Sequence, residues 1–261
     1  MDIKTPTIVT ALFDIGRDKW DNFNLSYHTY LHWMENLLMI QTNMVIYTDS
    51  ILYEDIIQMR KKYDTDLAKT KVVIKEVCEL EGYTRFGKSI FKVMQSNEFK
   101  RNIAFNVPEM TKPMYNIIMF NKLFFLNDCL QHNYFNSDML IWTDAACYRE
   151  KLDILNWPDL NKVNALDNSK ITMFTHSNNV NIGEPMHHVL SQVRFIQGGC
   201  FLVPINQVKS FVSMFISVVT KCIEAGYVGS DEKMFDLCYT HNQKAFNLIK
   251  CNWREYYNLF K

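Results

Sequence analysis

The sequence predicts an α/β protein in which helices cover one central, mainly parallel mixed sheet. Segments rich in β-branched residues alternate with segments whose apolar residues recur at helical spacing, an order typical of parallel strands joined by helical crossovers. The chain has 261 residues, of which 48% are hydrophobic, enough for a substantial core. We therefore expect a single domain over residues 1–261.

The first part of the chain carries the clearest alternation. The run TPTIVTALFD is β-branched and ends in a polar loop, as an N-terminal strand would. Aromatic and leucine side chains then recur at helical spacing, before a second strand-like run, NMVIYTDS. The expected order is strand, helix, strand, helix, strand, over residues 5–14, 20–40, 43–50, 51–63 and 71–77.

The later elements are predicted from apolar runs between polar stretches. Residues 80–113 are polar and mixed, so we expect an insert of short helices there. A helix over 114–133 leads into an apolar strand that ends at Asp144. The stretch VRFIQGGCFLVP has a Gly-Gly pair between two apolar halves, which predicts two short strands or one kinked strand. The other expected elements are a strand over 170–176, a helix over 205–225, and a helix capped by Ser230.

Composition excludes several classes of protein. Lys plus Arg and Asp plus Glu each total 28, so no global positive field favours nucleic acid. No apolar run approaches the roughly 18 residues of a membrane span. The seven cysteines show no CxxC pair, which is typical of reduced thiols in a cytoplasmic protein. The aromatic C-terminus, NWREYYNLFK, could cover the core, contact another subunit or touch the cytosolic face of a membrane.

Polar residues follow four of the expected strands. They are Asp14 with Arg17, Thr48 with Asp49, Asp144, and His176. In open α/β sheets, ligands bind outside the carboxyl ends of the strands. We therefore expect these side chains to share one edge of the sheet and to form a ligand site there.

Asp144 is the most informative of these residues because it ends the most hydrophobic strand. A carboxylate at such a place costs free energy unless it is paired, hydrogen-bonded or bound to a metal. Ala145 and Ala146 leave room for a ligand near the backbone. The alternative is an Asp that caps the next turn or pairs with Arg149.

Five stretches in the same order resemble a known family. They are TIVTALFDIGRDKWDNF, NMVIYTD, IWTDAACYR, FIQGGCFLVP and GSDEKMF. Together they resemble the WlaTC/HtrL (YibB-like) glycosyltransferase family over nearly the whole chain. The resemblance implies a GT-A fold, with a nucleotide-sugar-binding half over residues 1–150 and an acceptor-binding half over 151–261.

The resemblance also implies a donor site. Residues at the ends of the first two strands would border the base and ribose, Arg17 would offset diphosphate charge, and Asp144 would take the first place of an acidic DxD motif. The expected nucleotide-sugar-binding residues are Thr10, Ala11, Asp14, Arg17, Thr48, Asp49 and Asp144.

A divalent ion, Mn²⁺ or Mg²⁺, is implied at Asp144, where it would stabilise the leaving nucleotide. The sequence departs from the family pattern here, because Ala146 stands in the second acidic place. Either Asp144 acts with a histidine from elsewhere, His241 or His176, or basic side chains replace the ion. The sequence therefore does not decide whether donor binding depends on a metal.

On the acceptor side, the resemblance implies a loop at Gln197, Gly198 and Gly199, where glycines would let a sugar approach the backbone. The alternative is a bulge without a ligand. His187 of the pair His187–His188 is expected in the same acceptor site.

The first turn of the last predicted helix carries two acids. Asp231 is the candidate general base that deprotonates the acceptor hydroxyl, with Glu232 as second choice. The alternative is that both acids serve the helix dipole. Lys112, Asn121 and Lys122 could contact the donor, but a solvated helix face is the more typical role.

These inferences predict a glycosyltransferase that moves a sugar from a nucleotide-sugar donor, UDP-sugar favoured, to a glycan acceptor. Cytoplasmic placement is expected, with contact at the cytosolic membrane face left open. Two alternatives share the fold: a sugar nucleotidyltransferase, and a catalytically silent protein that binds nucleotide or glycan. The oligomeric state is not predicted.

Overall fold

The computed structural model describes residues 4–150, 154–177, 179–253 and 255–261. One mixed sheet of seven strands, in the order β3-β2-β1-β4-β6-β5-β7, runs through both halves of the chain. The strands are β1 (Thr7–Leu12), β2 (Asn43–Thr48), β3 (Thr70–Ile74), β4 (Met139–Thr143), β5 (Ile171–Thr175), β6 (Ile196–Pro204) and β7 (Phe246–Lys250). Only β6 runs antiparallel to its neighbours, so the predicted mainly parallel sheet is confirmed.

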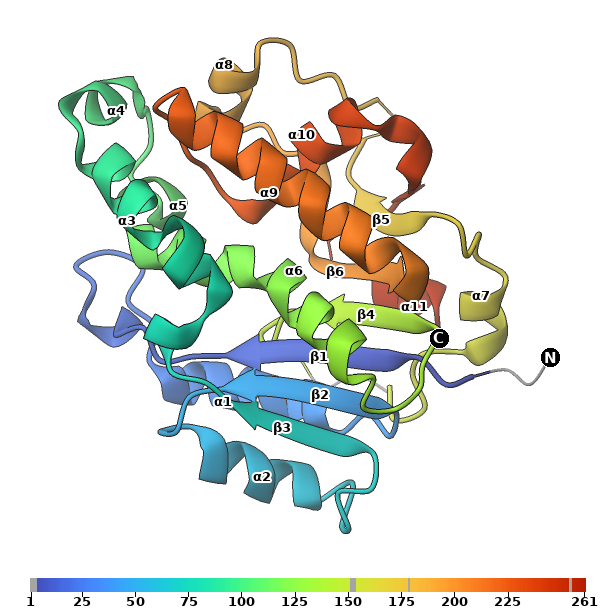
Figure 1. Ribbon diagram of the computed structural model, residues 1–261. Coiled ribbons are helices and arrows are strands. Elements are labelled where there is room, and N and C mark those ends of the chain that lie inside the picture. The colour runs from blue at the N-terminus through green and yellow to red at the C-terminus, as the bar shows by residue number, and fades with distance from the viewer. Residues whose placement is uncertain (1–3, 151–153, 178, 254) are drawn as a thin grey trace.

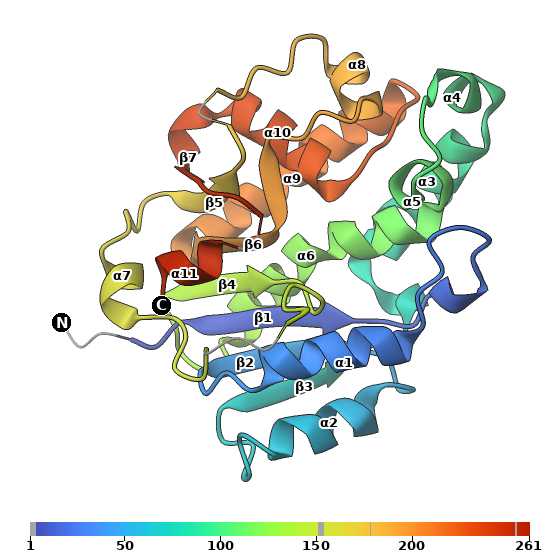
Figure 2. The same ribbon diagram turned by 180° about the vertical axis from the view of Figure 1, so that it is seen from behind.

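Helices cover both faces of the sheet, as Figures 1 and 2 show from opposite sides. On the face in front in Figure 1 lie α3 (Glu81–Gln95), α6 (Pro113–His132), α9 (Val208–Glu224) and α10 (Asp231–His241). The other face, in front in Figure 2, carries α1 (Tyr27–Leu38) and α11 (Tyr256–Leu259), with α2 (Tyr53–Lys61) beside α1. Short helices α4 (Asn97–Asn102), α5 (Pro108–Thr111), α7 (Leu160–Asn164) and α8 (Pro185–Leu190) fill the connections.

Successive side chains of the central strands enter different cores. Val9 and Val45 belong to the core beneath α6 and α9, whereas Ile8 and Met44 belong to the core beneath α1 and α2. Strands buried on both faces read as continuous apolar runs, which is why the sequence identified them.

The structure differs from the expected elements in two places and decides between two alternatives in a third. The insert contains α3, which at 15 residues is longer than the short helices expected. The Gly-Gly stretch is one strand, β6, whose register against β5 shifts between Met173 and Phe174, so the alternative of one irregular strand holds. β7 was not predicted, since it is a short edge strand of five residues, of which only Phe246 is buried.

The aromatic C-terminus covers the core, which was one of three roles left open. Tyr256, Tyr257 and Phe260 are at most 3% exposed. Among the described residues, no helix is both long and apolar enough to cross a bilayer.

Candidate active site

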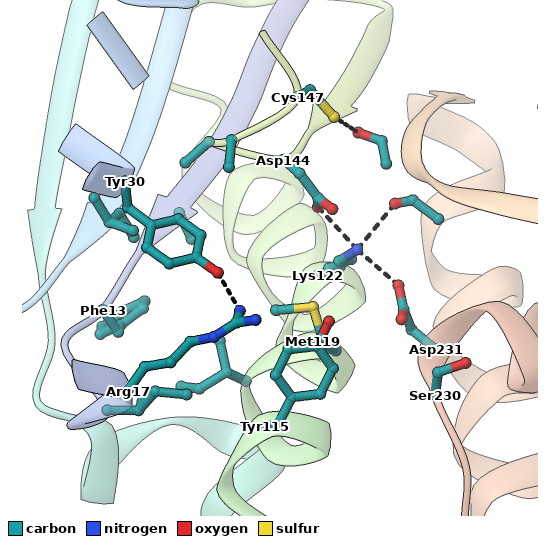
Figure 3. A pocket seen from close by; sticks show the side chains of 18 of the residues that line it. Phe13, Arg17, Tyr30, Tyr115, Met119, Lys122, Asp144, Cys147, Ser230 and Asp231 are labelled. Carbon is teal, nitrogen blue, oxygen red and sulfur yellow. Dashed lines mark hydrogen bonds and ion pairs between the residues drawn. The ribbon is translucent and has the colours of Figure 1, made fainter. Parts of the chain in front are cut away.

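A pocket opens at the carboxyl ends of β1 and β4, between α6 and the first turn of α10. Its volume is about 240 Å³, several times the roughly 30 Å³ that one water molecule occupies in the liquid. Figure 3 shows two sides: aromatic residues surround Arg17 on one side, and charged residues meet around Lys122 on the other. We call these the aromatic side (Phe13, Tyr27, Tyr30, Tyr115) and the ionic side (Lys122, Asp144, Asp231, Glu232).

Lys122 is the centre of the ionic side. Its side chain comes from α6 and is 3% exposed. Its Nζ lies 2.8 Å from Asp144 Oδ1 and 2.6 Å from Asp231 Oδ2, and it donates a hydrogen bond to the Gly198 carbonyl at 2.9 Å (Figure 3). One ammonium therefore connects the end of β4, the middle of the sheet at β6 and the start of α10.

Asp144 is held by more than this ion pair. The Trp142 indole Nε1 donates to Asp144 Oδ1 at 2.7 Å, and the Asp144 amide donates to the Gly199 carbonyl at 2.8 Å. The expectation that a carboxylate in this place needs a partner is thereby met. The partner is Lys122, and not Arg149, whose guanidinium lies over the Trp33 ring at 4.3 Å.

The charges of this cluster stabilise one another. Burial alone would lower the pKa of Lys122, but the two carboxylates outweigh it and hold the pKa above its ordinary value. Burial raises the pKa of Asp144, with a further rise from Asp231, while Lys122 opposes both. Lys122 thus remains an ammonium at any physiological pH.

The Gly-Gly pair of β6 makes room for this cluster. A Cβ on Gly198 would lie 2.5 Å from Asp231 Oδ2, and one on Gly199 would lie 3.0 Å from Cys147 Sγ. The groups that lie close to these glycines are therefore side chains of the chain itself, Asp231 at Gly198 and Cys147 at Gly199, and the approach of a sugar stays a prediction. Both glycines line the pocket.

Glu232 lies on the pocket wall beside Asp231. Its Oε1 accepts a hydrogen bond from the Gly198 amide at 3.2 Å, and its Oε2 lies 3.2 Å from Arg194 Nη1. Arg194 also pairs with Glu109 of α5. Burial, followed by repulsion from Asp231, raises the pKa of Glu232 to about 7, in spite of Arg194. A carboxylate with such a pKa can exchange a proton near neutral pH.

Arg17 dominates the aromatic side. Its guanidinium lies within 5.7 Å of the centroids of the Trp20, Tyr30 and Tyr115 rings, and it donates to the Tyr30 hydroxyl and, at 3.1 Å, to the Phe23 carbonyl. Guanidinium groups over aromatic faces are stabilised by the ring quadrupole. Arg17 is thus a positioned cation at the pocket wall, and no carboxylate pairs with it among the described ion pairs.

Most of the residues predicted for the site do meet in this pocket. Segments from residue 11 to residue 253 contribute to its walls, because β1 and β4 are neighbours and β6 lies next to β4. The predicted residues that line the pocket are Ala11, Asp14, Arg17, Asp144, Gly198, Gly199, Asp231 and Glu232.

Three predicted donor-site residues do not line it. Thr10 and Thr48 are fully buried in their strands. Asp49 is 3% exposed, and its carboxylate accepts hydrogen bonds from the amides of Asp14, Ile51 and Leu52. Asp49 therefore connects the loops after β1 and β2, and it fixes the backbone of the pocket residue Asp14 without lining the pocket itself.

Four other predicted residues also lie outside the pocket. His176 directly follows β5 and is exposed. Gln197 is buried and donates to the Cys251 carbonyl at 2.9 Å. His187 is exposed on α8, beside the capping Glu184. His241 is exposed at the far end of α10, about 15 Å from Asp231 by helical rise, so it cannot share an ion with Asp144 through this pocket.

The sequence interpretation missed the role of Lys122, for which a solvated face was the more typical expectation. This was wrong, because α6 carries apolar residues on all sides and is buried all round. That pattern was the available signal: a lysine in the middle of such a helix is buried, and a buried ammonium needs anionic partners. Tyr30, Tyr115 and Arg194 carried no comparable signal.

The residues around Asp144 do not fit a resident divalent ion. Such an ion takes several oxygen ligands, about six for Mg²⁺. Ala146 offers no side-chain oxygen, and Lys122 already bridges the carboxylates of Asp144 and Asp231. Within the part of the chain that the structure describes, no group of three or more His, Cys, Asp or Glu side chains could hold a metal.

One family model and one curated protein match nearly the whole chain. A family model described as "Bacterial protein of unknown function (HtrL_YibB)" matches residues 4–261. Protein HtrL of Escherichia coli (strain K12) is 22% identical over 273 residues, covering 98% of this chain and 91% of that protein.

Among solved structures, an active-site mutant of LgtC superposes with a TM-score of 0.52 at 8% identity, covering 93% of this chain and 72% of that one. The galactosyltransferase LgtC in complex with donor and acceptor sugar analogs gives a TM-score of 0.47 at 9% identity, over the same shares. The likeness to the first of these structures shows that the present chain shares the GT-A fold of LgtC.

Proposed function

We propose that this chain, which belongs to the HtrL_YibB family, is a glycosyltransferase that moves a sugar from a nucleotide-sugar donor to a hydroxyl group of a glycan acceptor. One observation carries the proposal: positioned cations and two carboxylates of α10 share one pocket at the carboxyl ends of β1 and β4. This is the edge where open α/β sheets bind ligands. The GT-A fold supports the same reaction class by analogy.

The two sides of the pocket suit the two parts of a donor. Aromatic faces stack with a nucleobase, and the aromatic side contains Phe13, Tyr27, Tyr30 and Tyr115. Arg17, with Arg149 on the same wall, offers guanidinium groups to a diphosphate. The donor would thus lie with its base beside Arg17 and its sugar toward the ionic side. UDP-sugar remains the first donor to test.

In the transfer step, the acceptor oxygen forms a bond to the anomeric carbon of the donor sugar. The bond from that carbon to the diphosphate oxygen breaks, and its electron pair goes to the nucleoside diphosphate. The acceptor hydroxyl proton goes to a carboxylate of the pocket. Atoms and charges balance without a further reactant.

The proton acceptor is one of the two acids in the first turn of α10. Asp231, the first candidate from sequence, is engaged by Lys122 at 2.6 Å. Glu232 faces the pocket with its pKa raised to about 7, near the value at which a general base works best at neutral pH. Glu232 is itself paired with Arg194, so its raised pKa is what favours it as the base, while Asp231 remains the partner of Lys122.

Thermal-shift measurements with UDP, GDP, CMP and dTDP test the donor site. At least one of them should raise Tm in proportion to the logarithm of its concentration. The Arg17→Met variant should bind that nucleotide at least tenfold more weakly, whereas Lys19→Met, an exposed lysine outside the pocket, should bind it normally. If no nucleotide raises Tm, the proposed function is wrong.

A further inference from the structure

We infer that Lys122 takes the place of a divalent ion in this pocket, so that donor binding and sugar transfer need no metal. The inference rests on the proposed function and specifies how its donor site is neutralised. In it, Lys122 is a positioning residue that acts through Asp144 and Asp231.

The ammonium has one hydrogen bond and two ion pairs. Lysine has three N–H donors, and Nζ has three oxygen neighbours, Asp144 Oδ1, Asp231 Oδ2 and the Gly198 carbonyl, at 2.6 to 2.9 Å. These oxygens come from three separate segments of the chain and converge on one point. They are also the oxygens that an ion at Asp144 would need.

A divalent ion cannot use these oxygens while Lys122 is present. The side chain is 3% exposed and packs against the Trp142 ring, with Nζ 5.8 Å from its centroid. An ion bound to Asp144 and Asp231 would lie beside a fixed positive charge, and like charges at such distances repel strongly where water is scarce. Because position 146 is an alanine, no second acid after β4 offers an ion a site farther from Lys122.

The ammonium also does what an ion would do for an anionic donor. Without a cation, two carboxylates at the end of β4 and the start of α10 would face the diphosphate. Asp144 is 32% exposed toward the pocket, so its neutralisation decides whether a phosphate can lie near it. Lys122 removes part of this repulsion, and Arg17 and Arg149 on the same pocket supply further positive charge.

The first test uses the unmodified protein. The Tm shift with the nucleotide found above, and the rate of sugar transfer from the matching nucleotide sugar, are measured with EDTA and with Mn²⁺ or Mg²⁺. Both should agree within about twofold between the two conditions. A nucleotide that binds only with the ion, or a rate that rises tenfold or more with it, would leave the proposed function standing and overturn the inference.

The second test removes the ammonium. In Lys122→Ala the two carboxylates lose their cation, so nucleotide binding in EDTA should weaken at least tenfold. Mn²⁺ alone should now raise Tm, and it should restore nucleotide binding at least in part. A merely structural lysine would produce no such response to the ion.

Lys233→Met is the matched control, since Lys233 is a second buried lysine whose ammonium contacts only uncharged oxygens of His188, Ser191 and Val193. Its variant should gain no response to Mn²⁺. An equal Mn²⁺ response in both variants would contradict the inference. If Lys122→Ala does not fold, as far-UV circular dichroism would show, the comparison of EDTA with Mn²⁺ in the unmodified protein decides alone.

Discussion

Two buried lysines, Lys122 of α6 and Lys233 of α10, differ in the charge of the oxygens around their ammonium groups. The pocket lysine site consists of Lys122 with Asp144, Asp231 and the Gly198 carbonyl. The α8 lysine site consists of Lys233 with the His188 and Val193 carbonyls and Ser191 Oγ. Both lysines are 2% exposed and both ammonium groups have three oxygen neighbours.

The difference lies in the charge of those oxygens. Carboxylates raise the pKa of Lys122 in spite of its burial, whereas burial lowers the pKa of Lys233 to about 8, because no carboxylate contacts it closely. Hydrogen bonds to uncharged oxygens therefore offset less of the cost of burying an ammonium than ion pairs with carboxylates do. Asp231, Glu232 and Lys233 are consecutive in α10. The first turn of this helix therefore contributes to both sites.

The largest effect is expected at Glu232, which lies between the two sites. If it is the base, Glu232→Gln should lower kcat about 100- to 10,000-fold, because the amide cannot accept the proton of the acceptor hydroxyl. In the unmodified protein kcat should rise as pH increases through about 7, and the variant should lose this dependence.

Asp231→Asn is the comparison for that measurement. It removes one carboxylate from Lys122 while leaving Glu232 in place, so its remaining activity should keep the rise through neutral pH. If the rise disappears in Asp231→Asn and persists in Glu232→Gln, the base is Asp231.

The next effect concerns stability of the pocket lysine site. Lys122→Met leaves two carboxylates at the pocket without their cation, and breaking such a buried pair costs about 3–5 kcal/mol. Urea unfolding should show this loss in the free energy of unfolding. Lys88→Met, an exposed lysine on α3, should change it by no more than about 0.5 kcal/mol. Equal losses in the two variants would mean that the ion pairs contribute nothing.

A smaller loss is expected at the α8 lysine site. In Lys233→Met the His188 carbonyl still accepts from the Ser191 amide and hydroxyl, so we expect a loss of about 1–3 kcal/mol, the cost of one unsatisfied buried acceptor. The same unfolding measurement should therefore rank Lys122→Met as the more destabilising change. The reverse order would show that the charge of the acceptors is not what distinguishes the two sites.

The pH dependence of stability separates the two sites by sign. The pKa of Lys233 falls from an ordinary 10.5 to about 8, so between these values the unfolded chain binds more protons and stability rises with pH. The pKa of Lys122 is raised, so its contribution is fully present below about pH 10.5 and is lost only at higher pH.

Unfolding curves at pH 7, 8, 9 and 10 check this prediction by difference. The free energy of unfolding of the unmodified protein, minus that of Lys233→Met, should increase from pH 8 to 10. The corresponding difference for Lys122→Met should stay flat over that range. If both differences in the free energy of unfolding changed with pH in the same way, the two lysine sites would not differ in their pKa shifts.

The smallest effect is expected at the start of α10, on which both sites depend. Ser230 Oγ accepts a hydrogen bond from the Lys233 amide, so Ser230→Ala should cost about 1 kcal/mol in unfolding experiments. Ser96→Ala, which removes the equivalent cap of α4, should cost a similar amount without affecting nucleotide binding. A much larger loss at Ser230 would mean that the cap also orders the pocket.

Much of the fold could be predicted because its signals are local. Apolar runs such as those of β1, β2 and β4 identify strands buried on both faces, and a Ser followed by acids identifies the start of α10. Asp144 was found in the same way, since an acid at the end of a buried strand needs a partner. β7 was not predicted, because a half-exposed edge strand shows only a weak pattern of apolar residues.

The sequence by itself determined the alternation of elements, the edge of the sheet where the pocket lies, and the acids at Asp144, Asp231 and Glu232. Only the tertiary structure decided which cation meets them. Lys122 is 22 residues before Asp144 and 109 before Asp231 in the chain, and its neighbourhood is set by how α6 packs between β4 and α10. The partner of a buried charge is fixed by distance in space, and local sequence patterns carry no information on that distance.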